Sequence, residues 1–330
     1  MVFTVKLLPS ERSFAVAPNQ SLLEGALGAG ISLDYGCANG SCGRCKAKLI
    51  SGNVVDARFH DYVISAREKL EGYVLLCSSE ARSNLIIEAR TVGGVEDVEL
   101  QTIKARFSRL VSGGSSIVIL NVRTPRSQVL RFLAGQHVSL TFPSQQSIML
   151  SLANCPCDGM NLEFHLPSDT LVSSSIGDLD ALKKGDVIWV HGPLGNFVLD
   201  EGAARPTLFI AVDSAFACIR SLIEQAMNLE WDQPIHLWRI IGDTGDPYLH
   251  NLCRSWADVW DDFHYRPLSM ADNQNWVLTL ERLLDELDLS QVDLYLAGRG
   301  EIIESVERLL QPQKAKVNRI FVNEFERERI

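Results

Sequence analysis

The spacing of hydrophobic positions changes twice along the chain and predicts three structural units. In the first unit, partial alternation over residues 2–8 and a further extended run at residues 13–16 predict a β-hairpin. Ser21 and Glu24 form the S-x-x-E pattern of a capping box, which predicts a helix beginning just after Ser21. Further short extended runs complete a small sheet-rich unit, at residues 46–50, 72–76 and 84–88.

The middle of the chain contains short extended runs that are separated by turn residues. These runs lie at residues 117–122, 138–142, 161–165 and 187–190. Proline or glycine stands between them, at Pro125, Gly135, Gly159 and Gly185. Several short strands at such a spacing are typical of an antiparallel β-barrel.

From residue 205 onward, apolar extended runs alternate with helical patterns, which favours a parallel α/β sheet. The expected strands lie at residues 207–212, 235–239 and 292–297, and the expected helices at 217–226 and 301–310. The sequence GGVEDVE at residues 93–99 combines glycines with acidic residues and marks a domain edge. We therefore expect three domains, at residues 1–98, 99–203 and 204–330.

Charge and hydropathy exclude two classes of partner. The 330 residues include 41 acidic and 31 basic side chains, a formal net charge of -10, which is the wrong sign for a protein that binds nucleic acid through its phosphates. The first twelve residues lack the apolar stretch of a secretory signal, and the longest apolar run, at residues 207–219, is interrupted by Asp213 and Ser214. We expect a cytoplasmic protein without a membrane partner.

The spacing of the cysteines gives the strongest chemical signal. Three of the eight cysteines lie in the segment YGCANGSCGRC, and a fourth follows later, which gives C-x4-C-x2-C…C with Cys37, Cys42, Cys45 and Cys77. This is the plant-type spacing for a [2Fe-2S] cluster held by thiolates. Gly36, Gly40 and Gly43 stand beside the ligands, where small residues let a short loop turn its sulfurs and backbone N–H groups inward.

The alternatives to a cluster are a structural zinc site and four ordinary buried cysteines. Zinc sites usually use two C-x2-C knuckles, whereas only Cys42 and Cys45 form such a pair here. The spacing therefore favours iron and sulfide. The other thiols are expected to be ordinary core or loop residues, namely Cys155, Cys157, Cys218 and Cys253.

Two segments of the first unit, YGCANGSCGRCKAKLISGNV and GYVLLCSSEARSNLIIEA, resemble the ferredoxin domain of oxygenase reductases. The resemblance extends over the whole chain to the three-domain reductases of phenol, benzoate and methane oxygenases and to the similar sugar dehydrase reductases. The further segments that carry it are AGQHV at 134–138, SLAN at 151–154, GPLGNF at 192–197 and YLH at 248–250. The resemblance implies a β-grasp ferredoxin domain, an antiparallel flavin-type barrel and a parallel α/β NAD(P)-type domain. In that family NAD(P)H reduces FAD, which passes single electrons to the cluster and then to an oxygenase.

The chain departs from the family at the flavin motif R-x-Y-S, whose arginine pairs with the pyrophosphate and whose tyrosine packs on the flavin. Only the serine is retained, because the corresponding residues are Ile148, Met149, Leu150 and Ser151. Loss of a charge-assisted arginine–phosphate contact costs about 1.5–3 kcal/mol, roughly ten- to a hundredfold in affinity. The second flavin phosphate site corresponds to residues 169–173, where the carboxylate of Asp169 would repel phosphate.

The nicotinamide motifs are altered as well. The family has Gly-Gly-Thr-Gly where this chain has Val212, Asp213, Ser214 and Ala215. Bulk and negative charge here oppose close approach of a dinucleotide and anion binding. The family's Cys-Gly-x-Pro becomes Ala297-Gly298-Arg299-Gly300, and Arg299 is expected to be a solvated charge rather than a phosphate ligand.

The four cysteines are intact, whereas the flavin and nicotinamide motifs are altered. This combination leaves two functions open. One is a working NAD(P)H-dependent reductase with an unusual flavin site, in which the cofactor-binding residues are Ser151, Asn154, His137, Ser173 and Gly298. The other is a reductase-like protein that kept the cluster but lost FAD and NAD(P)H binding, and serves as a one-electron relay, assembly subunit or redox sensor.

The expected partner is a protein electron acceptor such as an oxygenase component. Arg44, Lys46 and Lys48 make the surroundings of the cysteine loop locally basic. A partner with an acidic or apolar contact face would suit such a surface.

Overall fold

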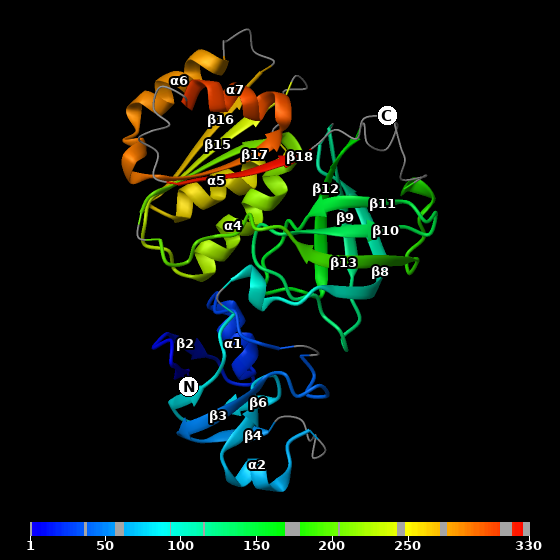
Figure 1. Ribbon diagram of the computed structural model, residues 1–330, viewed down its shortest axis with the longest axis vertical. Helices are drawn as coiled ribbons and strands as arrows, with labels where there is room; N and C mark the ends of the chain where they lie inside the picture. The colour runs from blue at the N-terminus through cyan, green and yellow to red at the C-terminus, as the bar shows by residue number, and fades with distance from the viewer. Residues whose placement is uncertain are drawn as a thin grey trace.

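The computed structural model describes most of the chain and arranges it around three large sheets (Figure 1). The described residues are 2–35, 38–56, 63–92, 94–114, 116–168, 179–203, 205–242, 248–270, 276–310 and 319–325. Among them, no helix has the length and apolar character needed to cross a bilayer.

The N-terminal region forms a mixed five-stranded sheet in the order β2-β1-β7-β3-β5, with α1 packed beside it (Figure 1). The hairpin of β1 and β2 is antiparallel, whereas β1 and β7 run parallel. Ser21 caps α1 through the predicted capping box with Glu24. The elements are β1 (Phe3–Leu8), β2 (Ser13–Val16), α1 (Leu22–Gly28), β3 (Lys46–Ser51), β4 (Val54–Asp56), α2 (Ala66–Leu70), β5 (Tyr73–Leu75), β6 (Ser79–Ala81) and β7 (Leu85–Glu88).

The middle region forms a six-stranded antiparallel sheet in the order β11-β10-β13-β8-β9-β12, which curls into an open barrel (Figure 1). Its alternate side chains point inward and build a core that includes Ile103, Leu120, Val138, Phe164 and Val190. The strands are β8 (Gln101–Ser112), β9 (Ile117–Arg123), β10 (His137–Thr141), β11 (Ser147–Ser151), β12 (Asn161–Pro167) and β13 (Val187–Leu194).

The C-terminal region forms a parallel five-stranded sheet in the order β16-β15-β14-β17-β18. Helices α4 and α5 cover one face and α6 and α7 cover the other (Figure 1). Along β14, Phe209 joins the core on the α4 side, whereas Leu208 and Ile210 join the core on the α6 and α7 side. The elements are β14 (Thr207–Val212), α4 (Phe216–Asn228), β15 (Ile235–Ile241), α5 (His250–Val259), β16 (Phe263–Ser269), α6 (Trp276–Glu286), β17 (Asp293–Arg299), α7 (Gly300–Leu310) and β18 (Arg319–Phe325).

The structure confirms the predicted fold class, but strand bounds differ and several elements were not predicted, among them β11, α5, β16 and α6. The predicted strand at residues 187–190 ends with the hydrophobic run, whereas β13 continues through Gly192 and Pro193. It continues because Gly192 pairs with Gln101 of β8 and Leu194 pairs with His137 of β10. The prediction also missed β8, although Ile103, Ala105 and Phe107 alternate along it and all three are buried.

Candidate redox centre and nucleotide crevice

Two of the predicted cluster ligands meet at one end of the β3–β5 strand pair. Cys45 directly precedes β3 and Cys77 follows β5, and these two strands pair in antiparallel fashion. The two Sγ atoms lie 3.2 Å apart, and both residues are buried. Cys42 lies on the exposed side of the same loop. The fold therefore brings together sulfurs that are 32 positions apart in the sequence.

The remaining ligand prediction falls partly outside the described residues. Cys37 and the neighbouring Gly36 are not among them. Within the described part of the chain, no group of three or more His, Cys, Asp or Glu side chains is close enough to hold a metal ion. Gly40 and Gly43 adopt positive φ angles of 88° and 77°, which glycine adopts readily, and this agrees with the expected tight turn.

The basic side chains around the cysteine loop face carboxylates of the protein itself. Arg44 Nη1 lies 2.7 Å from Glu99 Oε2 and its Nε lies 3.5 Å from Asp34 Oδ1. Lys46 Nζ lies 2.6 Å from Glu68 Oε1. Two of the three positive charges expected on a docking face are thus compensated internally. Lys48 is exposed and makes no ion pair with any described residue.

A buried arginine connects the cysteine loop to the barrel. Arg131 lies in the barrel region with a side chain only 7% exposed, and its Nη1 donates to Asp34 Oδ1 at 2.9 Å. Its Nη2 lies 3.7 Å from Glu99 Oε2. Arg44 and Arg131 therefore share the same two carboxylates. Burial lowers the pKa of Arg131, and the neighbouring carboxylates oppose this shift.

At the edge of the barrel, the strand that carries the flavin motif of the family offers no cation. Ile148 and Leu150 pair with Leu140 and Val138, and all four belong to the barrel core or pack against it. None of the residues of β11, Ser147–Ser151, is charged. The structure therefore agrees with the expected loss of the arginine–pyrophosphate contact.

The end of β11 does carry a polar group without a partner. Ser151 is 5% exposed, and its Oγ has no hydrogen-bond partner among the described residues. The same is true of Asn323 Nδ2 on β18, and both groups lie next to the thiol of Cys218. Burial raises the pKa of Cys218 to about 12, so this thiol stays protonated. His137 pairs with Ser151 across β10 and β11, which brings two predicted cofactor-binding residues together.

The other residues predicted to contact a cofactor are Asn154, Gly298 and Ser173. The side-chain amide of Asn154 is engaged by backbone groups of the protein itself. Its Nδ2 donates to the carbonyls of Cys155 and Asp158 in the same loop, and its Oδ1 accepts from the N–H of Glu163 on β12. This makes Asn154 a loop-stabilising residue in the structure. Gly298 packs against Val212, and a Cβ at this glycine would lie 2.7 Å from Val212 Cγ2. Ser173 and Asp169 lie outside the described residues.

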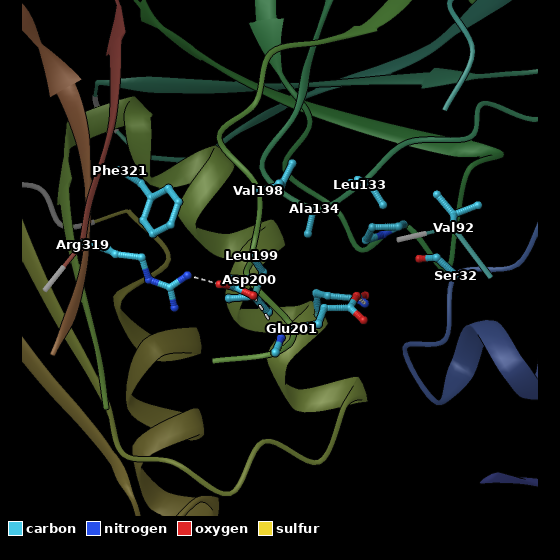
Figure 2. A pocket seen from close by; sticks show the side chains of 13 residues that line it. Ser32, Val92, Leu133, Ala134, Val198, Leu199, Asp200, Glu201, Arg319 and Phe321 are labelled. Carbon is cyan, nitrogen blue, oxygen red and sulfur yellow. Dashed lines mark hydrogen bonds and ion pairs between the residues drawn. The ribbon is translucent and has the colours of Figure 1, made fainter. Parts of the chain in front are cut away.

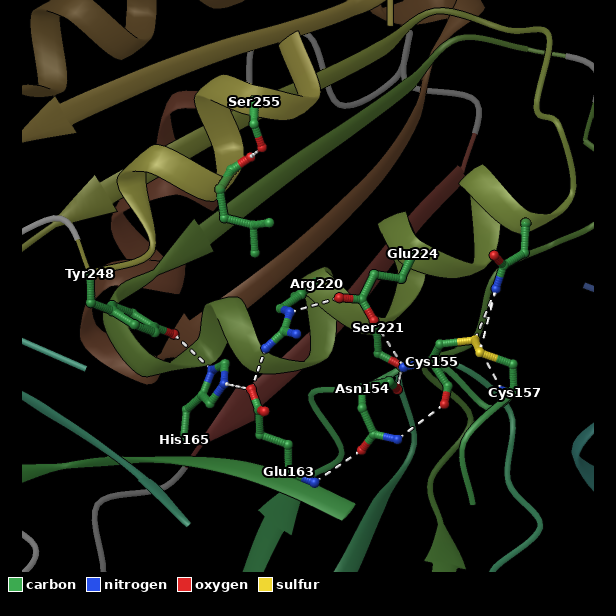
Figure 3. Close-up of polar contacts among 12 residues, drawn as sticks. Asn154, Cys155, Cys157, Glu163, His165, Arg220, Ser221, Glu224, Tyr248 and Ser255 are labelled. Carbon is green, nitrogen blue, oxygen red and sulfur yellow. Dashed lines mark hydrogen bonds and ion pairs between the residues drawn. A yellow bond between two sulfur atoms is a disulfide. The ribbon is translucent and has the colours of Figure 1, made fainter. Parts of the chain in front are cut away.

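A polar network joins the barrel to α4 and to the segment before α5 (Figure 3). His165 is buried between Tyr248, whose hydroxyl lies 3.2 Å from Nδ1, and Glu163, whose Oε1 lies 3.0 Å from Nε2. Arg220 on α4 pairs with both Glu163 and Glu224. Burial works against ionisation of Glu163, but hydrogen bonds from His165 and Arg220 lower its pKa to about 2.

Beside this network, Cys155 and Cys157 form a disulfide (Figure 3). The expectation that both are ordinary thiols is therefore wrong for this pair. Only Pro156 separates them, and the N–H of Cys155 donates to Glu224 Oε2 at 3.0 Å, which fixes the turn against α4. Cys218 and Cys253 are buried core residues, as expected.

A cavity of about 390 Å³ lies where the three regions meet (Figure 2). Its charged side chains are paired with one another or with neighbours, since Arg319 contacts Asp200 and Glu201 contacts Arg12 and Gln225. The lining residues are Ser32, Val92, Leu133, Ala134, Pro156, Val198, Leu199, Asp200, Glu201, Gly202, Gln225, Arg319 and Phe321. Gln225 also donates to the carbonyl of Gly30, so α4 contacts the N-terminal region directly.

The carboxyl ends of β14, β15 and β17 mark the place where a parallel sheet of this kind is expected to bind a nucleotide, and this edge is called the nucleotide crevice below. The sheet order reverses at β14, because β15 lies on one side of it and β17 on the other, and ligands bind at such switch points. Asp213 follows β14, and its carboxylate accepts from the Gly242 N–H at 2.7 Å. Its second oxygen lies 3.1 Å from Nη2 of Arg299, the last residue of β17.

This ion pair corrects the expectation that Arg299 is a solvated charge. Asp213 stands where the family has glycine, so the sequence did show a new negative charge at this position. Nothing in the sequence indicated that Arg299 is the partner of this charge. The orphaned polar groups of Ser151 and Asn323 fit the polar edge of a flavin ring. By contrast, the described residues of β11 supply no cation for the FAD pyrophosphate, and Asp213 adds negative charge at the crevice.

Known proteins resemble both the N-terminal region and the chain as a whole. The family described as 2Fe-2S iron-sulfur cluster binding domain matches residues 5–82. The CDP-6-deoxy-L-threo-D-glycero-4-hexulose-3-dehydrase reductase of Yersinia pseudotuberculosis is 26% identical over 98% of this chain and 99% of its own length. Reductase component 2 of the terephthalate 1,2-dioxygenase of a Comamonas species is 30% identical over 78% of this chain and 75% of its own length.

Solved structures agree on the fold. The crystal structure of the Amycolatopsis cytochrome P450 reductase GcoB superimposes with a TM-score of 0.61 at 21% identity, covering 98% of this chain and 99% of that protein. The matches support the cluster, FAD and NAD(P)H as cofactors, and none supports the alternative of a relay without flavin and nucleotide. The chain is an electron-transferring iron–sulfur oxidoreductase and belongs to the three-domain oxygenase reductase family.

Proposed function

We propose that this protein is the reductase component of an oxygenase system and delivers single electrons from a [2Fe-2S] cluster to the oxygenase. The observation that carries the proposal is the convergence of Cys45 and Cys77 at 3.2 Å within the region that matches the cluster-binding family. The proposed ligands are Cys37, Cys42, Cys45 and Cys77.

The barrel region would supply the electrons that reach the cluster. A flavin accepts a hydride from NAD(P)H and releases single electrons, which a [2Fe-2S] centre takes one at a time. We assign His137 and Ser151 to the flavin ring, because they pair where β10 begins and β11 ends and the Ser151 hydroxyl is buried without a hydrogen-bond partner among the described residues. Arg131 is assigned a positioning role, since it links the barrel to the carboxylates that hold Arg44.

We propose domain boundaries after residues 98 and 203. The first hydrophobic core contains buried residues from Val5 to Ala89, and the barrel core contains those from Ile103 to Val190. The core on the α4 side of the parallel sheet also includes Ile117 and Phe197, which supports a firm contact between the last two domains. Limited proteolysis should cut first near residues 93–99 if this division is right.

A second acceptor is supported by one specific observation. The match to the sugar dehydrase reductase spans 98% of this chain and 99% of that protein. A sugar dehydrase is therefore the second candidate partner.

The test combines metal analysis with anaerobic reduction of the purified full-length protein. We expect two irons and two sulfides per chain, released FAD after denaturation, and bleaching of the cluster absorption by NAD(P)H. Zinc without iron would exclude the proposal. Iron and sulfide without flavin, with bleaching by dithionite only, would exclude the NAD(P)H-driven part of it.

A further inference from the structure

The nucleotide crevice already contains an anion supplied by the chain. The carboxylate of Asp213 contacts the two groups at the carboxyl edge that suit a phosphate, namely the Arg299 guanidinium and the Gly242 N–H. A guanidinium and a backbone N–H at the switch point of a parallel sheet are typical phosphate-binding groups. Both are therefore engaged before any nucleotide arrives.

This internal contact can exchange with an external anion. The side chain of Arg299 is 44% exposed and that of Asp213 is 29% exposed, so water reaches the pair and the cost of separating it is small. Asp213 also holds a left-handed backbone conformation with φ of 47°, which asparagine tolerates and glycine adopts freely. The backbone at position 213 therefore accepts asparagine or glycine, neither of which would place a negative charge beside Arg299.

We propose that Asp213 determines nucleotide affinity by competing with the phosphates of NAD(P)H for Arg299 and the Gly242 N–H. This inference rests on the proposed reductase function and deepens it. When a dinucleotide binds, the carboxylate has to leave Arg299, and it remains close enough to repel the incoming phosphate. The wild-type protein therefore binds the nucleotide weakly and releases it readily.

The test is isothermal titration calorimetry of the full-length holoprotein with NAD⁺ and NADP⁺. Asp213→Asn keeps the shape and an acceptor for Gly242 but removes the charge, and we expect it to bind roughly ten- to a hundredfold more tightly than the wild type. Asp213→Gly is the second variant, because its backbone suits φ of 47°. Adding Arg299→Gln to Asp213→Asn should abolish the gain.

The matched control is Asp261→Asn, which removes the same charge from an exposed residue before β16, at the opposite edge of the same sheet. It should leave the affinity unchanged. If the wild type binds nucleotide and neither Asp213 variant binds it more tightly, the inference is wrong and the proposed function stands. If no variant binds at millimolar concentration, the inference and the NAD(P)H-driven function both fail.

Discussion

The cysteine loop and the nucleotide crevice both contain arginine–carboxylate pairs, but the pairs occupy different places. Around the loop, Arg44 turns toward Asp34 and Glu99, and the ion pairs tie the loop to its neighbours. In the crevice, the pair of Asp213 and Arg299 lies at the binding edge itself. The comparison teaches that the same interaction supports a site when it lies beside the ligand position and competes with the ligand when it lies in that position.

The largest effect should come from replacing a cluster ligand. Cys77→Ser removes a thiolate at a buried position, and we expect loss of the cluster absorption and of all electron transfer. Iron and sulfide analysis together with the visible spectrum measures this. Cys253→Ser is the matched control, since Cys253 is also a buried cysteine and lies on α5, outside the N-terminal region. The iron content of this variant should equal that of the wild type. Equal loss in both variants would contradict the ligand assignment.

A smaller effect on folding is expected from a buried arginine of β15. Arg239 is 2% exposed, its guanidinium lies 4.1 Å from the ring centre of Phe216, and it donates to the Tyr248 carbonyl at 2.5 Å. Arg239→Leu should lower the free energy of unfolding by about 2–3 kcal/mol, because a desolvated cation–π contact and a charged hydrogen bond are lost.

Urea unfolding followed by circular dichroism measures this loss. Arg254→Leu on the exposed side of α5 provides the control and should change the free energy of unfolding by about 0.5 kcal/mol or less. Equal stability of the two variants would show that the contacts of Arg239 with Phe216 and Tyr248 do not contribute to the free energy of unfolding.

The contact between the loop and the barrel can be weakened separately. Arg131→Met keeps an apolar stem in the buried position but removes the bond to Asp34, and we expect a loss of about 1–3 kcal/mol. If Arg131 positions the cluster, reduction of the cluster by NAD(P)H should slow while reduction by dithionite keeps its rate. Unchanged rates with both reductants would limit Arg131 to a structural role.

The weakest expected effect is a change in the pH dependence of stability. Burial lowers the pKa of His165, so the unfolded chain takes up a proton near pH 6.5, before the folded protein does. The free energy of unfolding should therefore fall as the pH drops below about 6.5. It should fall again below about 4.5, as Glu163 loses the advantage of its pKa of about 2.

Chemical denaturation at pH 7, 6 and 5 follows this dependence. His165→Gln should flatten the first part of the curve, because its side chain does not titrate. An unchanged slope in the variant would assign the dependence to other groups, such as His236, whose pKa burial lowers to about 4.

Much of the fold follows from local patterns in the sequence. Ser21 and Glu24 predicted the start of α1, and the apolar run of β14 is observed at its predicted bounds, Thr207–Val212. Such elements depend on neighbouring residues, which the sequence displays directly. The prediction was poorer where pairing decided the outcome, as in β13, which continues through Pro193 because two partner strands hold it.

The amino-acid sequence alone determined the order of the three units and the cysteine spacing, because both are properties of residues close together in the chain. Only the tertiary structure decided that Cys45 meets Cys77, that the amide of Asn154 binds the backbone of β12 at Glu163 and that Asp213 pairs with Arg299. The physical reason is that these contacts join residues from different strands and loops. Their distances depend on sheet order and strand register, which no local pattern specifies.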